Sequence, residues 1–231
     1  MKLNVHERGE GDKVALLIHG GMSDHRTWHA VEDELIARGY RVIAPDLRGH
    51  GLSPRGEYEP ELLADDLVEN VPTGVDVAIG HSIGGLALAF AVQRLRPARA
   101  IYSDPGFRLE NNPPGIEKFM LAMVENATAE SVSARNPRWS AADVEAELAG
   151  FALFDHKVLD LTVGETALRY LPTEAVVPSL VQLADPSLVI RDKTAQELRD
   201  NGFEVRSVKG AGHCIHRDDL PGFFSSLDGW I

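Results

Sequence analysis

The sequence has little cysteine, few basic residues and no long apolar run, and each shortage argues against a class of protein. Cys214 is the single cysteine among 231 residues, so no disulfide can form within the chain. Asp and Glu outnumber Lys and Arg by 35 to 23, and the resulting formal charge of -12 repels a nucleic acid backbone or an anionic membrane surface. We therefore expect neither nucleic acid nor a membrane as a partner.

Membrane insertion and secretion are also disfavoured. No stretch approaches the roughly 18 consecutive apolar residues that a membrane-spanning helix needs, and the opening residues MKLNVHERGEGD hold no apolar signal-peptide core. Hydrophobic residues make up 44% of the chain, which is enough for a sizeable core. We expect a cytoplasmic protein, a monomer or homodimer, that acts on a small molecule without a cofactor or metal.

Apolar runs of strand length recur, and helical patterns follow most of them. Helices are predicted at 60–70, 83–95, 193–201 and 218–230, and another ends near residue 38. Such alternation implies parallel strands joined by right-handed crossovers, with helices on both faces of one twisted sheet, which is the α/β fold class. The strands are predicted at 3–7, 14–18, 40–44, 75–79, 98–103, 179–183 and 203–208.

The alternation lapses in the middle of the chain. Helical patterns at 115–126, 141–156 and 164–170 follow one another there, separated by Asn-Pro breaks. This pattern indicates a block of helices inserted at 107–177, with 1–106 and 178–231 forming the core domain.

A serine stands at a sharp junction in VAIGHSIGGLALAF, residues 77–90. An apolar strand ends there and a helix begins at once, so the chain must turn within very few residues. Gly80 and Gly84 allow backbone segments to pass where a Cβ would clash, and Ser82 lies at the apex of the turn.

Five motifs lie at the ends of predicted strands. They are His19-Gly20-Gly21, Pro45-Asp46-Leu47-Arg48-Gly49-His50-Gly51-Leu52-Ser53, Gly80-His81-Ser82-Ile83-Gly84-Gly85, Asp185 and Gly210-Ala211-Gly212-His213. In parallel sheets ligands bind beyond the carboxyl ends of the strands, so the loops that carry these motifs share one rim. Taken together, the five motifs resemble the α/β-hydrolase superfamily, in particular its capped, serine-nucleophile members of the esterase and lactonase type.

The resemblance implies a catalytic triad, in the order nucleophile, acid, histidine. A serine hydroxyl needs a neighbouring base, and the base needs a carboxylate to fix its tautomer, so Ser82 is the expected nucleophile and His213 the expected base. Asp185, 28 positions before His213, is the favoured acid. Asp104 follows the strand after the nucleophile helix and is the reserve, because some relatives take their acid from that position.

The same resemblance implies an oxyanion hole and a cap-lined pocket. The backbone N–H groups of Ile83 and Gly21 are the expected oxyanion donors, with Met22 as a one-residue alternative to Gly21. In relatives the cap supplies most of the substrate pocket. The candidate substrate-binding residues are Met22, His81, Phe107, Trp139 and Phe154.

The predicted function is that of a serine hydrolase that cleaves a small carboxylic ester, lactone or thioester through an acyl-enzyme. A hydrolase-like receptor or scaffold with slow or no turnover is an alternative, as is a cofactor-free lyase or cyclase that uses His213 as a base without acylating Ser82. Modification of Ser82 by a fluorophosphonate probe distinguishes these functions.

Overall fold

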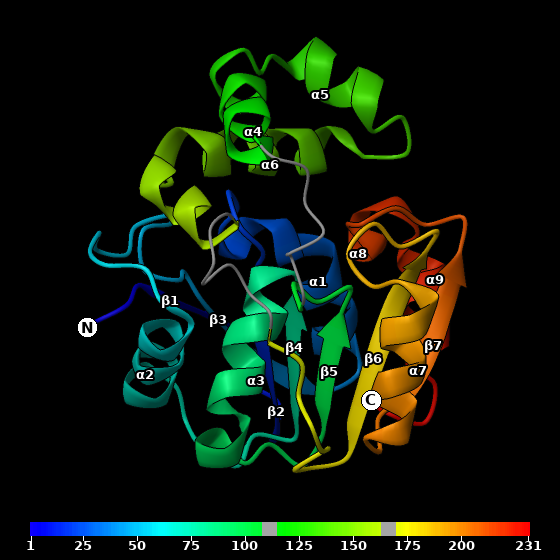
Figure 1. Ribbon diagram of the computed structural model, residues 1–231. Helices are drawn as coiled ribbons and strands as arrows, with labels where there is room; N and C mark the ends of the chain where they lie inside the picture. Colours follow the sequence, from blue (N-terminus) through cyan, green and yellow to red (C-terminus); the bar gives the residue numbers. More distant parts are fainter. Residues whose placement is uncertain (108–114, 163–169) are drawn as a thin grey trace.

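A computed structural model of the chain describes residues 1–107, 115–162 and 170–231, and within them seven strands form one sheet (Figure 1). The strand order is β1-β3-β2-β4-β5-β6-β7, and every neighbouring pair is parallel except β1 with β3. The predicted α/β fold class is confirmed. The strands are β1 (Val5–Arg8), β2 (Lys13–Ile18), β3 (Tyr40–Pro45), β4 (Val77–His81), β5 (Ala100–Ser103), β6 (Ser179–Asp185) and β7 (Glu204–Lys209).

Helices cover both faces of the sheet, because each strand between β2 and β6 is apolar on both sides. One apolar core lies under α2 (Pro60–Asn70), α3 (Ile83–Leu95) and α7 (Asp192–Asp200). The other lies under α1 (His29–Ala37) and α9 (Leu220–Ser226), with α8 (Ile215–Asp218) and the 3-10 turn η1 (His25–Trp28) beside it. No helix in the described ranges has the length and apolarity to cross a membrane.

The predicted bounds of α2 and α3 match the structure to the residue, but the single helix predicted at 218–230 is wrong. Helix α8 ends at Asp218, and α9 starts only after Asp219, whose φ of -153° and ψ of 78° are not helical. The Asp219 carboxylate accepts a hydrogen bond from the Gly222 N–H at 2.9 Å and so caps the new helix.

A separate layer of helices lies above the carboxyl edge of the sheet (Figure 1). These cap helices are α4 (Ile116–Glu125), α5 (Ala129–Arg135), α6 (Ala141–Leu153) and the 3-10 helix η3 (His156–Thr162). Helix α5 was not predicted, although Thr128 and Ser131 form a capping box at its start. The helix predicted at 164–170 lies outside the described residues except for Tyr170, and the cap limits of 107 and 177 remain predictions.

Helix α6 is held closely to the core. A Cβ on Gly150 would lie 2.8 Å from the Met22 carbonyl oxygen, so the glycine allows direct backbone contact with the loop after β2. The His29 imidazole in α1 hydrogen-bonds Asp143 of α6, with 3.0 Å between Nε2 and Oδ1. Ser140 also donates to Asp143, at 2.6 Å. The cap helix and the core are therefore joined by a partly buried ion pair.

This pair predicts a pH-dependent stability. The hydrogen bond to Asp143 raises the pKa of His29 above its ordinary 6.5, so the contribution of His29 is complete below that value and is lost as the pH rises through the raised pKa. Burial alone would raise the pKa of Asp143, but hydrogen bonds from His29 and Ser140 outweigh it and lower the pKa to about 2. The contribution of Asp143 is therefore present above its ordinary 3.8 and is lost as the pH falls toward 2.

Between pH 6 and pH 9, we expect the free energy of unfolding to fall by about 0.5 kcal/mol more in the wild type than in His29→Gln. The expected difference is small because the His29 side chain is one-third exposed and solvent weakens the ion pair. Urea unfolding at a series of pH values measures the difference. Asp143→Asn should remove the same excess slope, and an equal slope in the wild type and both variants would contradict the assignment.

Candidate active site

The serine predicted at the turn stands at the junction of β4 and α3 with a strained backbone. Ser82 has φ 51° and ψ -119°, a region that residues with a side chain rarely occupy. A Cβ placed on Gly80 would lie 2.5 Å from the Gly84 carbonyl oxygen. A Cβ placed on Gly84 would lie 2.3 Å from the Ile18 carbonyl oxygen. The chain can make this turn only because both positions lack a side chain.

The predicted histidine lies in the loop after β7 and contacts a carboxylate. His213 Nδ1 is 2.7 Å from Oδ2 of Asp104, which is fully buried at the end of β5. The other carboxylate oxygen of Asp104 accepts hydrogen bonds from the Ser187 hydroxyl at 2.7 Å and from the Ala184 N–H at 3.3 Å. Three donors thus fix the carboxylate, and the carboxylate fixes the imidazole.

The prediction that Asp185 would be the partner of His213 is wrong, and the reserve residue Asp104 takes that position. Both aspartates end neighbouring parallel strands at the same edge of the sheet. Asp185 is exposed and pairs through its backbone with the loop after β7, where Gly210 donates to its carbonyl oxygen. Asp104 instead has φ 40° and is buried against the histidine loop.

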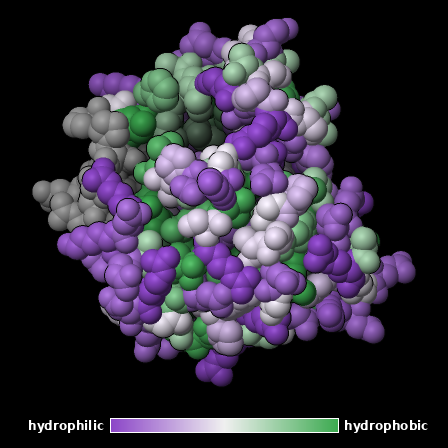
Figure 2. All heavy atoms as spheres, turned by 90° about the vertical axis from the view of Figure 1, so that its right-hand side faces the viewer, coloured by the Kyte–Doolittle hydropathy of each residue, from purple (hydrophilic) through white to green (hydrophobic). Residues whose placement is uncertain are grey.

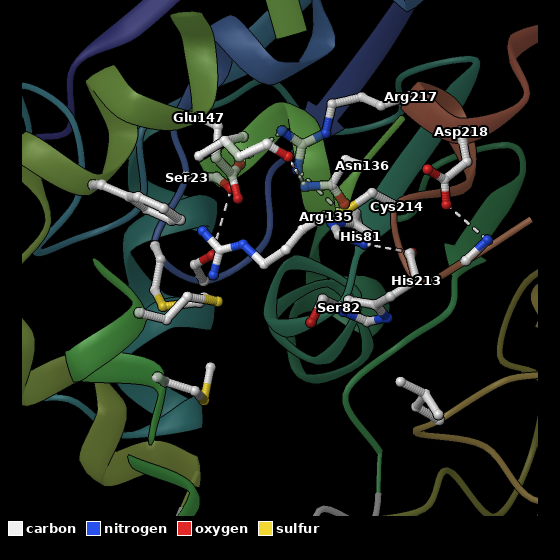
Figure 3. Close-up of a pocket in the computed structure, with 18 of the residues that line it drawn as sticks. Ser23, His81, Ser82, Arg135, Asn136, Glu147, His213, Cys214, Arg217 and Asp218 are labelled. Atoms are coloured by element: carbon white, nitrogen blue, oxygen red, sulfur yellow. Dashed lines mark hydrogen bonds and ion pairs between the residues drawn. The ribbon is translucent and has the colours of Figure 1, made fainter. Parts of the chain in front are cut away.

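Ser82 and His213 line one cavity (Figure 3). Because Asp104 engages Nδ1, the remaining ring nitrogen of His213, Nε2, is the one available to the serine. His81, predicted to bind substrate, lines the same cavity, but its Nε2–H donates to the His213 carbonyl oxygen at 3.0 Å. Burial, with the neighbouring His213, lowers the pKa of His81, so it remains neutral and supports the histidine loop.

The three backbone positions predicted for the oxyanion hole also meet at this cavity. Gly21, Met22 and Ile83 all line it, and a Cβ on Gly21 would be 3.7 Å from the Ile83 side chain. Met22 has φ 60°, so the loop after β2 turns sharply there. The N–H group of Ile83 lies in the first turn of α3, where it has no carbonyl partner within the helix. Which of Gly21 and Met22 supplies the second donor remains a prediction.

The cavity has a volume of about 780 Å³ and extends between the cap helices and the sheet edge. Phe119 and Leu188 line it and are 67% and 83% exposed, so they mark its mouth. Figure 2 shows a recess beneath the upper helices with apolar residues at its edge, whereas polar residues cover most of that face. The other apolar residues that line the cavity include Met120, Met123, Trp139, Phe151, Val158 and Leu159.

Of the candidate binding residues, Met22 and Trp139 line the cavity, but Phe107 and Phe154 do not. Phe107 is fully buried against Tyr102 in the core beneath α3. Phe154 is 2% exposed and stacks on His50. Both predictions are wrong because an aromatic residue in an inserted segment has two buried destinations, the core and the cavity, and sequence spacing does not distinguish them.

Sequence reasoning missed a polar network on one wall of the cavity. The Arg217 guanidinium donates to Glu147 at 2.7 Å and stacks over the Trp139 ring, 3.8 Å from its centroid. The Trp139 N–H donates to Asp218 at 2.9 Å. Burial raises the pKa of the neighbouring Cys214 thiol to about 11, so this cysteine is a neutral wall residue. Arg217 and Asp218 lie in α8, whereas Glu147 and Trp139 lie in the cap. This network therefore also joins the cap to the core.

The described residues contain one cluster with the donor types of a metal site: Asp24, His25 and Asp46, whose ligand atoms lie within 4.8 Å of one another. These carboxylates already have protein partners. Asp24 pairs with Arg26, and Asp46 accepts hydrogen bonds from His25, Leu52 and Asn4. The cluster therefore holds the loops after β2 and β3 together.

The fold and the site together define an α/β hydrolase. The model of the Alpha/beta hydrolase family matches residues 15–224, and the chain belongs to that family. An uncharacterised protein of Mycobacterium bovis is 41% identical over 129 residues, which are 49% of this chain and 37% of the relative. This chain thus aligns with little more than a third of that relative's length.

Two further relatives match nearly the whole fold. Pimeloyl-[acyl-carrier protein] methyl ester esterase of Yersinia enterocolitica is 26% identical over 195 residues, 79% of this chain and 75% of the relative. The solved structure of Est816, described as an N-acyl homoserine lactone degrading enzyme, superposes with a TM-score of 0.77 at 21% identity, covering 99% of this chain and 96% of that one. At that identity the superposition establishes a shared fold.

The close backbone contacts of Gly84 predict that replacing it with alanine destabilises the protein, although helix propensity alone predicts a gain in stability. Gly84→Ala should gain almost 1 kcal/mol from propensity, yet we expect a net loss of about 3 kcal/mol because its Cβ would overlap the Ile18 carbonyl. Gly74→Ala is the control, with φ 71° and no atom within 4 Å, and it should lose about 1–2 kcal/mol. Urea unfolding measures both, and a Gly84→Ala protein as stable as the wild type would contradict the packing.

Proposed function

We propose that this α/β hydrolase is a serine hydrolase that cleaves a small-molecule carboxylic ester, lactone or thioester through an acyl-enzyme. The observation that carries the proposal is the 2.7 Å hydrogen bond between His213 and the buried Asp104, made at the cavity that Ser82 also lines. Nucleophile, base and orienting carboxylate are the minimum that such chemistry requires.

In the first step, the Ser82 oxygen attacks the ester carbonyl carbon while His213 Nε2 takes the hydroxyl proton. The carbonyl π electrons move onto oxygen, and the N–H groups of Ile83 and of Gly21 or Met22 stabilise that oxyanion, each contributing about 3 kcal/mol. The tetrahedral intermediate then collapses: the bond to the leaving alkoxide breaks, and His213 returns the proton to it. The products are an alcohol and acylated Ser82.

In the second step, His213 removes a proton from a water molecule, which attacks the acyl carbon. The bond between Ser82 and the acyl group breaks, the serine oxygen regains a proton from His213, and the carboxylic acid leaves. Asp104 stays ionised throughout, keeps the imidazole in one tautomer and stabilises its charged form.

The size and the mostly apolar lining of the cavity support a substrate with an acyl chain. A volume of about 780 Å³ lined mostly by apolar side chains accommodates an acyl chain of moderate length. The two relatives named above are described as a methyl ester esterase and a lactone-degrading enzyme, and both reactions are of the same class. No separate observation favours the alternative function, a receptor without turnover.

Replacement of the nucleophile tests covalent catalysis. Ser82→Ala should reduce the hydrolysis of short p-nitrophenyl esters at least a hundredfold, because the loss of such a nucleophile removes several orders of magnitude in kcat. A fluorophosphonate probe should label the wild type at Ser82, as mass spectrometry of the modified peptide can determine. An unlabelled but folded wild-type protein would favour a receptor or a lyase.

Asp104 and Asp185 provide a matched pair of variants that tests which carboxylate orients the His213 imidazole. Asp104→Asn should lower kcat about ten-thousand-fold, because an amide favours the wrong imidazole tautomer. Asp185→Asn makes the same chemical change at the end of the next strand, on an exposed side chain, and should leave kcat within about twofold. Steady-state kinetics on one ester decide between them, and a larger loss in Asp185→Asn would reverse the assignment.

A further inference from the structure

The charged side chains that line the cavity do not balance. Among the described lining residues, three guanidinium groups (Arg135, Arg138 and Arg217) face two carboxylates (Glu147 and Asp218). The excess cation stands out because the whole chain carries a formal charge of -12. Three guanidinium groups and two carboxylates leave a formal charge of +1 among the described residues that line the cavity together with Ser82.

Two of the three arginines are committed to protein partners. Arg217 is 7% exposed and donates to Glu147 at 2.7 Å, with Cys214 and the Trp139 ring as its other neighbours. Arg138 donates to the Gly210 carbonyl oxygen at 2.6 Å and lies 3.5 Å from the Asp218 carboxylate. Both carboxylates of the cavity are satisfied by these contacts, so neither is available to the third arginine.

Among the described lining residues, Arg135 is the cation whose guanidinium is not fully engaged. It ends α5, and its Nε donates to the Ser131 carbonyl oxygen one turn earlier, at 3.2 Å. That contact fixes the base of the guanidinium, and its two terminal nitrogens have no partner among the described residues. Figure 3 shows the side chain extending into the cavity rather than away from it. Four N–H bonds, two on each terminal nitrogen, are therefore free to bind a ligand.

We propose that the substrate is a half-ester of a dicarboxylic acid, whose free carboxylate binds Arg135 while its ester carbonyl lies at Ser82. The inference rests on the proposed function and adds the substrate class to it. A planar guanidinium matches a carboxylate with two parallel hydrogen bonds, and the mostly apolar lining of the cavity suits a methylene spacer. The carboxylate belongs to the acyl part, because that part stays bound through both steps and the alcohol does not.

The test compares monomethyl with dimethyl esters of straight-chain dicarboxylic acids, from succinate to sebacate. These pairs differ in one charge and hardly in shape. For the preferred chain length, the wild-type kcat/KM should be at least tenfold higher for the monomethyl ester, mainly through KM. Arg135→Gln should reduce that ratio at least tenfold, and Arg135→Lys should retain part of it.

Arg138→Gln is the matched control, because it removes the same charge from the same cavity at a guanidinium that already has partners. It should leave the monomethyl-to-dimethyl ratio within about twofold of the wild type. A wild-type ratio of one or less at every chain length would overturn the proposal, as would a ratio that Arg135→Gln does not change or that Arg138→Gln reduces equally.

A binding measurement separates this inference from the proposed hydrolysis. In Ser82→Ala protein, calorimetry with the free dicarboxylates should detect binding, and adding Arg135→Gln should weaken it at least tenfold while adding Arg138→Gln does not. If no ester is hydrolysed and no probe labels Ser82, the hydrolase proposal fails, yet this binding still decides whether Arg135 holds a carboxylate. Equal affinity with and without Arg135 would refute it.

Discussion

The hydrogen bond between the His213 imidazole and the Asp104 carboxylate is the contact on which the geometry of the site depends. It joins the end of β5 to the loop after β7, two strands that are separated by β6. The carboxylate is fully buried and could not stay there charged without donors, and His213, Ser187 and the Ala184 N–H supply them. Because Ser187 and Ala184 belong to β6 and its following loop, three neighbouring strand ends must be in place before His213 has a fixed orientation.

The nucleophile position imposes a second constraint, which is steric. The turn at Ser82 brings α3 so close to β2 that the Gly84 backbone touches the carbonyl oxygen of Ile18. The same closeness places the first turn of α3 beside the loop that carries Gly21 and Met22, so potential oxyanion donors from two segments face one cavity. Backbone packing, rather than side-chain choice, therefore determines where an oxyanion could bind.

The cap helices determine what kind of molecule the cavity can hold. They supply most of its apolar lining and also Arg135, and they are held to the core by polar contacts such as His29 with Asp143 and Arg217 with Glu147. Among the described lining residues, Arg217 pairs with Glu147 and Arg138 with Asp218, which leaves the guanidinium of Arg135 over. Substrate selectivity in this interpretation follows from a charge balance between cap and core.

The sequence by itself determined the α/β class, the bounds of α2 and α3, and the positions of Ser82 and His213. These follow from local rules: hydrophobic period, glycines where backbones cross, and motifs at the ends of strands. Tertiary structure alone decided that Asp104 and not Asp185 meets His213, that Phe107 and Phe154 are buried outside the cavity, and that the terminal nitrogens of Arg135 pair with no residue in the described ranges. Neighbouring parallel strands end at one edge with the same residue type, so only the direction of each side chain, set by packing around it, separates one aspartate from the other.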